Sequence, residues 1–143
     1  MAGDITKCGF VSEGATIAGR AQEAISGGQF VKLMSGAGIT NQTNYTQAIE
    51  VALADATADA EYAIGMALNN ATSGNDVTVA LPPSIVIATA GGSMTAPGKS
   101  VKVATGTDAT AVQADTTGVS GIGINLTTAA SGELVLVKLG GCK

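Results

Sequence analysis

The sequence predicts an all-β protein made of small β-barrel or β-sandwich modules, in two tandem related copies with little helix. Short apolar runs with alternating polarity lie between Gly, Pro and Ser turn signals, which is the pattern of strands. An internal repeat spans much of the chain. Aromatic residues make up only 3% of the sequence and Trp is absent, so the core must consist of Val, Ile, Leu and Ala.

The repeat has two parts. Residues 64–81 match residues 122–139 at a constant offset of 58, with nine of eighteen positions identical. A shorter match relates residues 28–36 to residues 98–106 at an offset of 70. Each copy therefore reads G-x-x-V-K-[LV]-x-[ST]-G, followed later by I-G-x-x-L-x-x-A-x-S-G-x-x-V-x-V-x-L. The repeat divides the chain into an N-terminal arm (1–16), a first β module (17–81), a Pro-Pro linker (82–83) and a second β module (84–143).

Within each copy, alternation predicts a pair of strands. They cover 64–68 and 77–81 in the first copy, and 122–126 and 134–139 in the second. A Ser-Gly turn joins each pair, and we expect Gly74 and Gly132 to have positive φ because glycine tolerates that conformation. The predicted module core contains Ile64, Val79, Ile122 and Val137.

Between the two matches, the pattern is less clear. Residues 48–54 alternate like a strand, although their Ala and Glu content also suits a helix, and residues 55–61 are expected to form a turn or short helix. Pro82 and Pro83 cannot lie in a central strand, since proline has no N–H to donate. Residues 84–89 are predicted to open the second copy as a strand.

Catalytic and metal-binding motifs are weak in this sequence. The chain has no histidine, which excludes Ser-His, Cys-His and His-metal sites. Cys8 and Cys142 lack metal-site spacing; they either remain free thiols or form a disulfide that joins the two ends. We expect no enzymatic activity, no cofactor and no metal.

Three further patterns are better explained by structure than by chemistry. Residues 91–100 resemble a phosphate-binding loop, but Ser93 replaces the first required glycine and a strand pattern follows instead of a helix. Asp55, Asp59 and Glu61 lack calcium-loop spacing. Glycosylation sequons begin at four asparagines, and we attribute them to chance: Asn41, Asn44, Asn70 and Asn125.

The charge content limits the partners. Charged residues make up 13% of the chain, and the net charge is −4 with seven Lys and Arg, which disfavours nucleic acid. No apolar run reaches the roughly 20 residues of a membrane helix. The first residues lack the pattern of a secretion signal, so we expect synthesis in a host cytoplasm without export.

The repeated G-x-x-V-K-L and I-G-x-x-L-x-x-A-x-S-G-x-x-V-x-V-x-L pattern resembles the capsid decoration (cement) proteins of tailed bacteriophages, over about residues 17–139. The resemblance implies a virion structural protein that binds the outside of the capsid and stabilises it. The implied partner is the major capsid protein, and the family analogy favours a homo-oligomer, most simply a trimer.

Small, neutral side chains offer few strong anchors for a single contact, so attachment would need several contacts at once. The expected capsid or subunit interface includes Phe10, Val11 and Ile17. Two alternatives stay open. One is another virion or surface-layer structural role, such as a head-fibre base or tail component, and the other is a carbohydrate-binding β module, for which the chain has few aromatic platforms.

Overall fold

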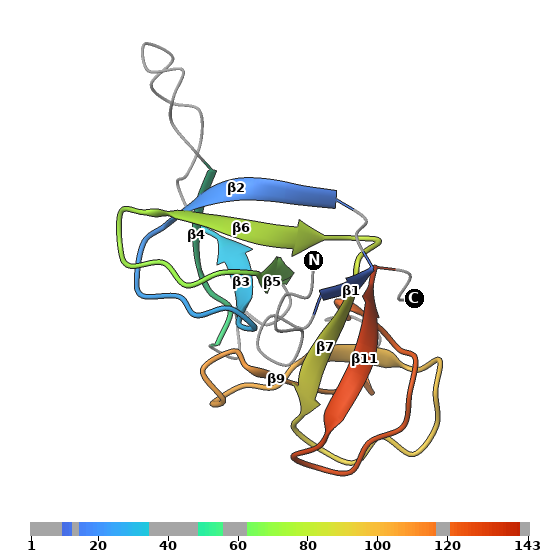
Figure 1. Ribbon diagram of the computed structural model, residues 1–143. Helices are drawn as coiled ribbons and strands as arrows, with labels where there is room; N and C mark the ends of the chain where they lie inside the picture. The colour runs from blue at the N-terminus through green and yellow to red at the C-terminus, as the bar shows by residue number, and fades with distance from the viewer. Residues whose placement is uncertain (1–9, 13–14, 35–48, 56–62, 117–120, 141–143) are drawn as a thin grey trace.

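The computed structural model describes residues 10–12, 15–34, 49–55, 63–116 and 121–140, and these form strands, turns and loops without a helix (Figure 1). The all-β prediction is therefore confirmed. Within the described residues, eleven strands follow one another: β1 (Phe10–Ser12), β2 (Ala15–Ala21), β3 (Phe30–Leu33), β4 (Ile49–Leu53), β5 (Ala63–Ala67), β6 (Asp76–Leu81), β7 (Ile85–Ala90), β8 (Ser100–Val103), β9 (Ala111–Ala114), β10 (Gly123–Asn125) and β11 (Leu134–Leu139).

The strands form two closed five-stranded barrels. The first barrel has the order β2-β4-β3-β5-β6, in which β2 is parallel to β4 and antiparallel to β6. The second has the order β7-β11-β10-β8-β9, closed by a parallel pairing of β7 with β9. Each pairing of the first barrel recurs in the second between strands five places later in the chain. The predicted duplication is thus a duplication of one barrel.

The predicted strands lie close to the observed ones. Residues 48–54 contain β4, so this segment is a strand, whereas most of the predicted turn at 55–61 lies outside the described residues. The predicted strand at 122–126 is shorter in the structure, where β10 covers Gly123–Asn125. Pro82 and Pro83 lie exposed in the turn between β6 and β7, at the passage from one barrel to the other.

The segment assigned to an N-terminal arm contributes to both barrels. Within it, β1 pairs with β7 of the second barrel, with Phe10 opposite Val86. Ala15 and Thr16 already belong to β2, opposite Leu81 and Ala80. The arm boundary at residue 16 therefore falls inside a strand, because the backbone groups of these residues have hydrogen-bonding partners on β6.

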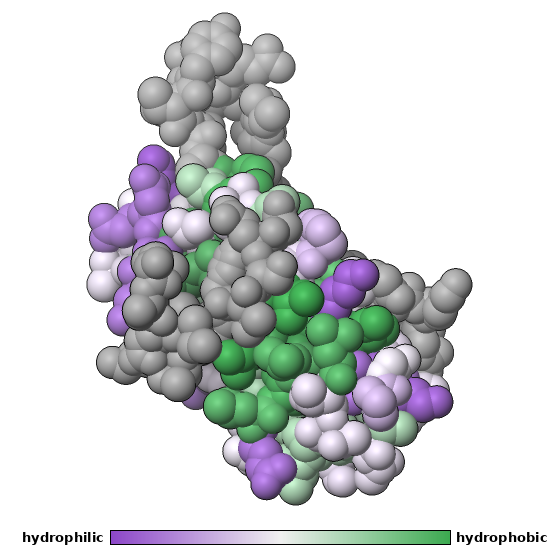
Figure 2. All heavy atoms as spheres, turned by 45° about the vertical axis from the view of Figure 1, so that its right-hand side comes forward, coloured by the Kyte–Doolittle hydropathy of each residue, from purple (hydrophilic) through white to green (hydrophobic). Residues whose placement is uncertain are grey.

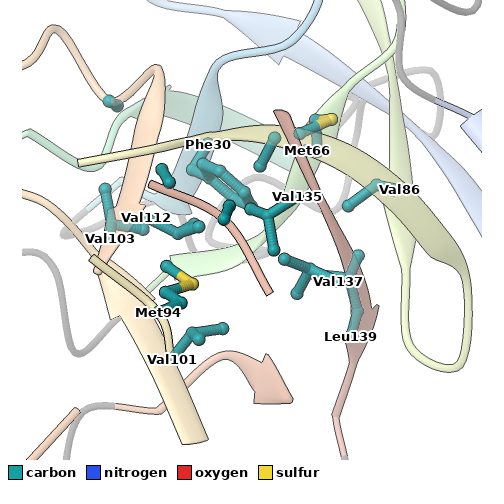
Figure 3. Packing of buried hydrophobic residues seen from close by; sticks show 14 of the residues in the cluster. Phe30, Met66, Val86, Met94, Val101, Val103, Val112, Val135, Val137 and Leu139 are labelled. Atoms are coloured by element: carbon teal, nitrogen blue, oxygen red, sulfur yellow. The ribbon is translucent and has the colours of Figure 1, made fainter. Parts of the chain in front are cut away.

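The buried side chains form two clusters. The smaller cluster fills the first barrel and includes Val31, Ala67 and Val79. The larger one fills the second barrel and also contains Phe30, Met66 and Ala80 from the first. Phe30 and Met66 lie beside Val135 and Val86 in Figure 3. Strands β3, β5 and β6 thus place alternate side chains in their own barrel and in the core of the other, which unites the two barrels.

Two of the three corresponding positions of the second barrel are more polar. Phe30, Met66 and Ala80 correspond to Ser100, Ile124 and Lys138 by the two repeat offsets. Lys138 is exposed, and the other two are half-buried. Because a charged side chain resists burial without a partner, this face of the second barrel does not repeat the packing of the first. The two copies therefore differ in surface although they share a fold.

Val79 and Val137 are both fully buried and correspond to each other in the repeat. Replacing either one with alanine should lower the free energy of unfolding by about 1–3 kcal/mol, through lost burial and an unfilled cavity. Urea denaturation of the single variants measures this loss. Lys102→Ala, at a half-buried charged position of β8, serves as a control with a smaller expected effect. Equal stability of all three variants would contradict the core assignment.

Candidate functional site

The predicted turn and core residues occupy equivalent positions in the two barrels. Gly74 and Gly132 have φ of 86° and 87°, and each donates its N–H over 2.7 Å to the carbonyl of a matching residue, Ala21 or Ala90. Ile64 and Ile122 are only half-buried, and each packs against the edge of a cluster. Ile64 lies within β5 and Ile122 just before β10, and part of each side chain stays outside the core.

The segment at 91–100 leads into a strand. Its last residue, Ser100, opens β8, so no helix N-terminus faces this loop. Gly98 N–H donates to the Asn125 carbonyl over 2.7 Å, and Lys99 N–H donates to Asn125 Oδ1 over 2.8 Å. These two amides already have acceptors within the protein. The geometry is that of a turn fastened to β10.

Asn125 holds this loop in place from the interior. Its side chain is fully buried, and Nδ2 donates to the carbonyls of Ala96 (2.9 Å) and Thr127 (3.0 Å). A buried amide is costly unless its groups are hydrogen-bonded, and here both ends of the amide are satisfied. The sequon that begins at Asn125 is therefore a structural feature of the second barrel, and the exposed Asn70 accepts the Gly27 N–H over 2.9 Å in the first.

Asp55 joins the two barrels. Its Oδ1 accepts the N–H groups of Thr107 (3.1 Å) and Ala109 (3.0 Å) in the β8–β9 loop. Asp108 and Ala109 have φ of 52° and 56°, and this left-handed turn lies in the loop whose N–H groups at residues 107 and 109 donate to the same carboxylate oxygen. Phe30 N–H donates to the Ala109 carbonyl over 2.8 Å beside it. The carboxylate singled out in the sequence thus acts as a structural anion between modules.

Replacing Asp55 with alanine should lower the free energy of unfolding by about 1–3 kcal/mol, because two partly buried N–H groups lose their acceptor. Asp55→Asn keeps one acceptor oxygen and should lose less. Asp76→Ala removes an exposed carboxylate of the first barrel and is the matched control. Chemical denaturation ranks the three variants, and an Asp55→Ala protein as stable as Asp76→Ala would show that the contact contributes little.

The other residues singled out for chemistry are not brought together by the described structure. Asp59, Glu61, Cys8, Cys142, Asn41 and Asn44 lie outside the described residues. Among the described ones, no group of three His, Cys, Asp or Glu side chains is placed to hold a metal ion. Nor does any helix in the described part have the length and apolarity to cross a membrane.

The predicted interface residues lie at the start of the fold. Phe10 and Val11 belong to β1, which pairs with β7. Ile17 lies opposite Val79 on β2 and is half-buried against the core of the first barrel. Its counterpart by strand pairing is Val86, which is fully buried. Ile17 therefore packs against the core of the first barrel while part of its side chain stays accessible, and its contact with a partner stays a prediction.

Sequence reasoning missed an apolar surface on the second barrel. Leu134 and Leu136 alternate with the buried Val135 and Val137 along β11, so they face outward. Leu136 lies opposite Ile87 on the paired strand β7, and Leu134 and Ile87 line a hollow of about 150 Å³ whose lining also includes Gly27 and Gly28 of the first barrel. Comparing the outward positions of the two copies could have found this surface, since the first copy has Asp76 and Thr78 there.

Comparisons with known proteins find similarity at the level of three-dimensional structure. No protein-family model matches the chain, and no curated protein does. Among solved structures, the chain is similar to the head fiber gp8.5 N base of bacteriophage phi29, with 16% sequence identity and a TM-score of 0.56. The match covers 90% of this chain and 96% of the other. At this identity, the similarity shows a shared fold.

Proposed function

We propose that this protein is a structural component of a phage particle, attached to the outside of the head as the base of a head fibre. The observation that supports this most is the shared two-barrel fold, which extends over nearly all of the phi29 head-fibre base. The conclusion depends on fold similarity, and fold alone does not determine function, so it needs a direct test.

The chemistry of the described residues is consistent with a binding role. The Lys99 N–H in the loop at 91–100 and the Oδ1 atom of Asp55 form hydrogen bonds within the protein. Tightly packed barrels of small side chains make a rigid platform, and closed barrels present few free strand edges that could pair with unrelated chains. The proposed partner is the major capsid protein, and the proposed location is the outer capsid surface.

Attachment in this proposal depends on several contacts at once. A head has many equivalent capsid subunits, so an oligomer of this protein binds through repeated weak contacts whose effects multiply. The trimer implied by the cement-protein resemblance remains part of the proposal.

Two measurements on purified particles test the proposal. Mass spectrometry of particles should detect this protein in a fixed ratio to the major capsid protein, and cryo-electron microscopy should place the two barrels on the outer head surface. Its absence from purified heads, or density confined to the tail, would refute the proposal.

The second candidate is a cement protein, which the shared repeat pattern favours. A cement protein binds the assembled lattice in preference to free capsid protein and so stabilises the head by mass action. Heads lacking this protein should then release DNA at a lower temperature than intact heads. A fibre base predicts heads of unchanged stability that have lost their projections.

A further inference from the structure

Strand β2 of the first barrel has an open edge along its first half. On one side, β6 follows β2 over nearly its whole length, whereas on the other side β4 pairs only with residues 19–21 (Figure 1). Among the described residues, no strand pairs with residues 15–18 on the β4 side. Ala15, Thr16 and Ala18 are exposed there.

Hydrogen bonds at the end of β2 show which backbone groups point to this open edge. The Ala21 N–H donates over 2.9 Å to the carbonyl just before β6, and the Gln22 N–H donates over 3.0 Å to the Val51 carbonyl of β4. Successive residues of a strand point their N–H and C=O groups to opposite sides, so Thr16 and Ala18 face the same side as Gln22. Neither residue has a backbone hydrogen bond on that side within the part of the chain that the structure describes.

The second barrel has a strand at the equivalent edge. Val86 of β7 is the counterpart of Ile17. On this side of β7, β9 pairs only with the last two residues, and β1 pairs with the beginning, antiparallel and with Phe10 opposite Val86. Within the described residues, the sheet of the second barrel therefore has six strands, and that of the first has five.

The apolar interior of the first barrel is also less covered at this end, where β2 begins and β3 and β6 end. Three inward-directed aliphatic residues keep exposed surface: Ile17, Leu33 and Leu81. Their counterparts in the second barrel are buried: Val86, Val103 and Leu139. Figure 2 shows apolar surface on the upper part of the first barrel. An added strand on β2 would pair the open backbone groups and cover part of this surface.

The N-terminal segment has the length and the pattern that this edge requires. Nine residues precede Phe10, and fully extended they reach about 30 Å from β1. Ile5 lies between Asp4 and Thr6, the alternation of a strand with one apolar face. An antiparallel arm with Ile5 opposite Ile17 would repeat the pairing of β1 with β7 and leave Asp4 and Thr6 in solvent.

The direction of β1 favours the edge of another copy. Because β1 is antiparallel to β7, the chain at Phe10 points along β7 toward Thr89. The beginning of β2 lies in the opposite direction, three residues beyond Ser12. A neighbouring molecule is therefore a more direct target for the arm than the first barrel of the same chain.

We infer that the open edge of β2 receives residues 1–9 of a second copy as an added antiparallel strand. Strand addition gains main-chain hydrogen bonds, and alternate side chains supply the specificity. Here the main-chain bonds are with Thr16 and Ala18, and Ile5 of one copy packs on Ile17 of the other. Each copy gives one arm and receives one, which builds a symmetric oligomer. This association is a property of the free protein and does not rest on the proposed function.

Sedimentation velocity of the full chain over a range of concentrations tests the arm. The wild-type protein should associate reversibly, and Ile5→Asp should require at least tenfold higher concentration, because its carboxylate would be buried beside Ile17. Thr6→Asp places the same charge on the outward side of the arm. It is the matched control and should associate like the wild type.

The receiving edge is tested by Ala18→Pro. Proline removes the N–H that points to the arm and leaves the pairing with β6, which uses the alternate residues, in place. The variant should associate at least tenfold more weakly than Ala18→Val, which changes the same exposed position and keeps the N–H. Hydrogen–deuterium exchange gives an independent measure with Ala18 intact. The amides of residues 16 and 18 should exchange more slowly in the associated wild type than in Ile5→Asp.

Three results would overturn the inference. A wild-type protein that stays monomeric would show that the edge is empty or is filled from within the same chain. Equal weakening by Ile5→Asp and Thr6→Asp would show a contact without the alternation of a paired strand. An Ile5→Asp protein that associates normally but no longer binds isolated phage heads would assign the arm to the capsid.

Discussion

Replacing Gly65 with alanine is expected to destabilise the first barrel by about 3 kcal/mol or more, and Gly123→Ala should do the same in the second. A Cβ at Gly65 would lie 2.0 Å from the Ala80 carbonyl oxygen, and a Cβ at Gly123 would lie 2.2 Å from the Lys138 carbonyl oxygen. These contacts are with backbone of the paired strand, which cannot rotate away as a side chain can. Relief requires separating β5 from β6, or β10 from β11.

Alanine substitutions at two other glycines are controls that distinguish steric overlap from backbone strain. A Cβ at Gly92 meets nothing within 4 Å, and Gly92→Ala should leave stability nearly unchanged. Gly74 also has open space around it but has a φ of 86°, so alanine there should cost about 1 kcal/mol through conformation alone. Guanidinium denaturation should rank the losses as Gly65, then Gly74, then Gly92. If Gly65→Ala were as mild as Gly92→Ala, the close packing of β5 on β6 would be incorrect.

Replacing Phe30 with alanine should lower the free energy of unfolding by about 3–5 kcal/mol, the range for truncating a fully buried aromatic side chain. Phe30 has no exposed surface and belongs to the cluster that fills the second barrel, although its strand is in the first. Its backbone N–H also donates to Ala109 of the second barrel over 2.8 Å. Its removal should therefore weaken the junction between the barrels as well as the core.

The effect on the junction can be measured apart from the loss of core packing. In the Phe30→Ala protein, unfolding should broaden or split into two steps, since barrels that no longer support each other unfold independently. Leu33→Ala on the same strand removes a side chain that is 48% exposed and should leave a single transition. A Phe30→Ala protein that loses stability in one unchanged step would show that the barrels remain coupled without this side chain.

The alternation and the repeat were enough to predict strands and a duplicated unit, because period-two burial and turn glycines are local properties of the chain. Val135–Leu139 shows this clearly, as it alternates between buried and outward positions, whereas in Val77–Leu81 the alternation stops at Ala80, which packs into the core of the other barrel. Ile17 was harder to interpret. Its pattern shows only that it is apolar, and pairing with β6 is what directs it toward the core of the first barrel.

Asp55 illustrates the same limit for a polar residue. The sequence places it near Asp59 and Glu61, whereas its hydrogen bonds are with Thr107 and Ala109, more than fifty positions away. Spacing along a chain predicts contacts only where a regular element fixes the geometry between the residues. No single helix or strand contains both Asp55 and the β8–β9 loop. The hydrogen-bond partners of Asp55 therefore depend on how the two barrels pack.

By itself, the sequence determined the fold class, the duplication and most strands of this protein, since those follow from local periodicity and from similarity between its own segments. Only the tertiary structure decided that Phe30, Met66 and Ala80 pack into the core of the other barrel, and that Ile87, Leu134 and Leu136 form one outward face. An apolar side chain gains about the same free energy whether it is buried in its own barrel or in the other one. Which surface removes it from water depends on how the closed barrels meet, and no single segment encodes that arrangement.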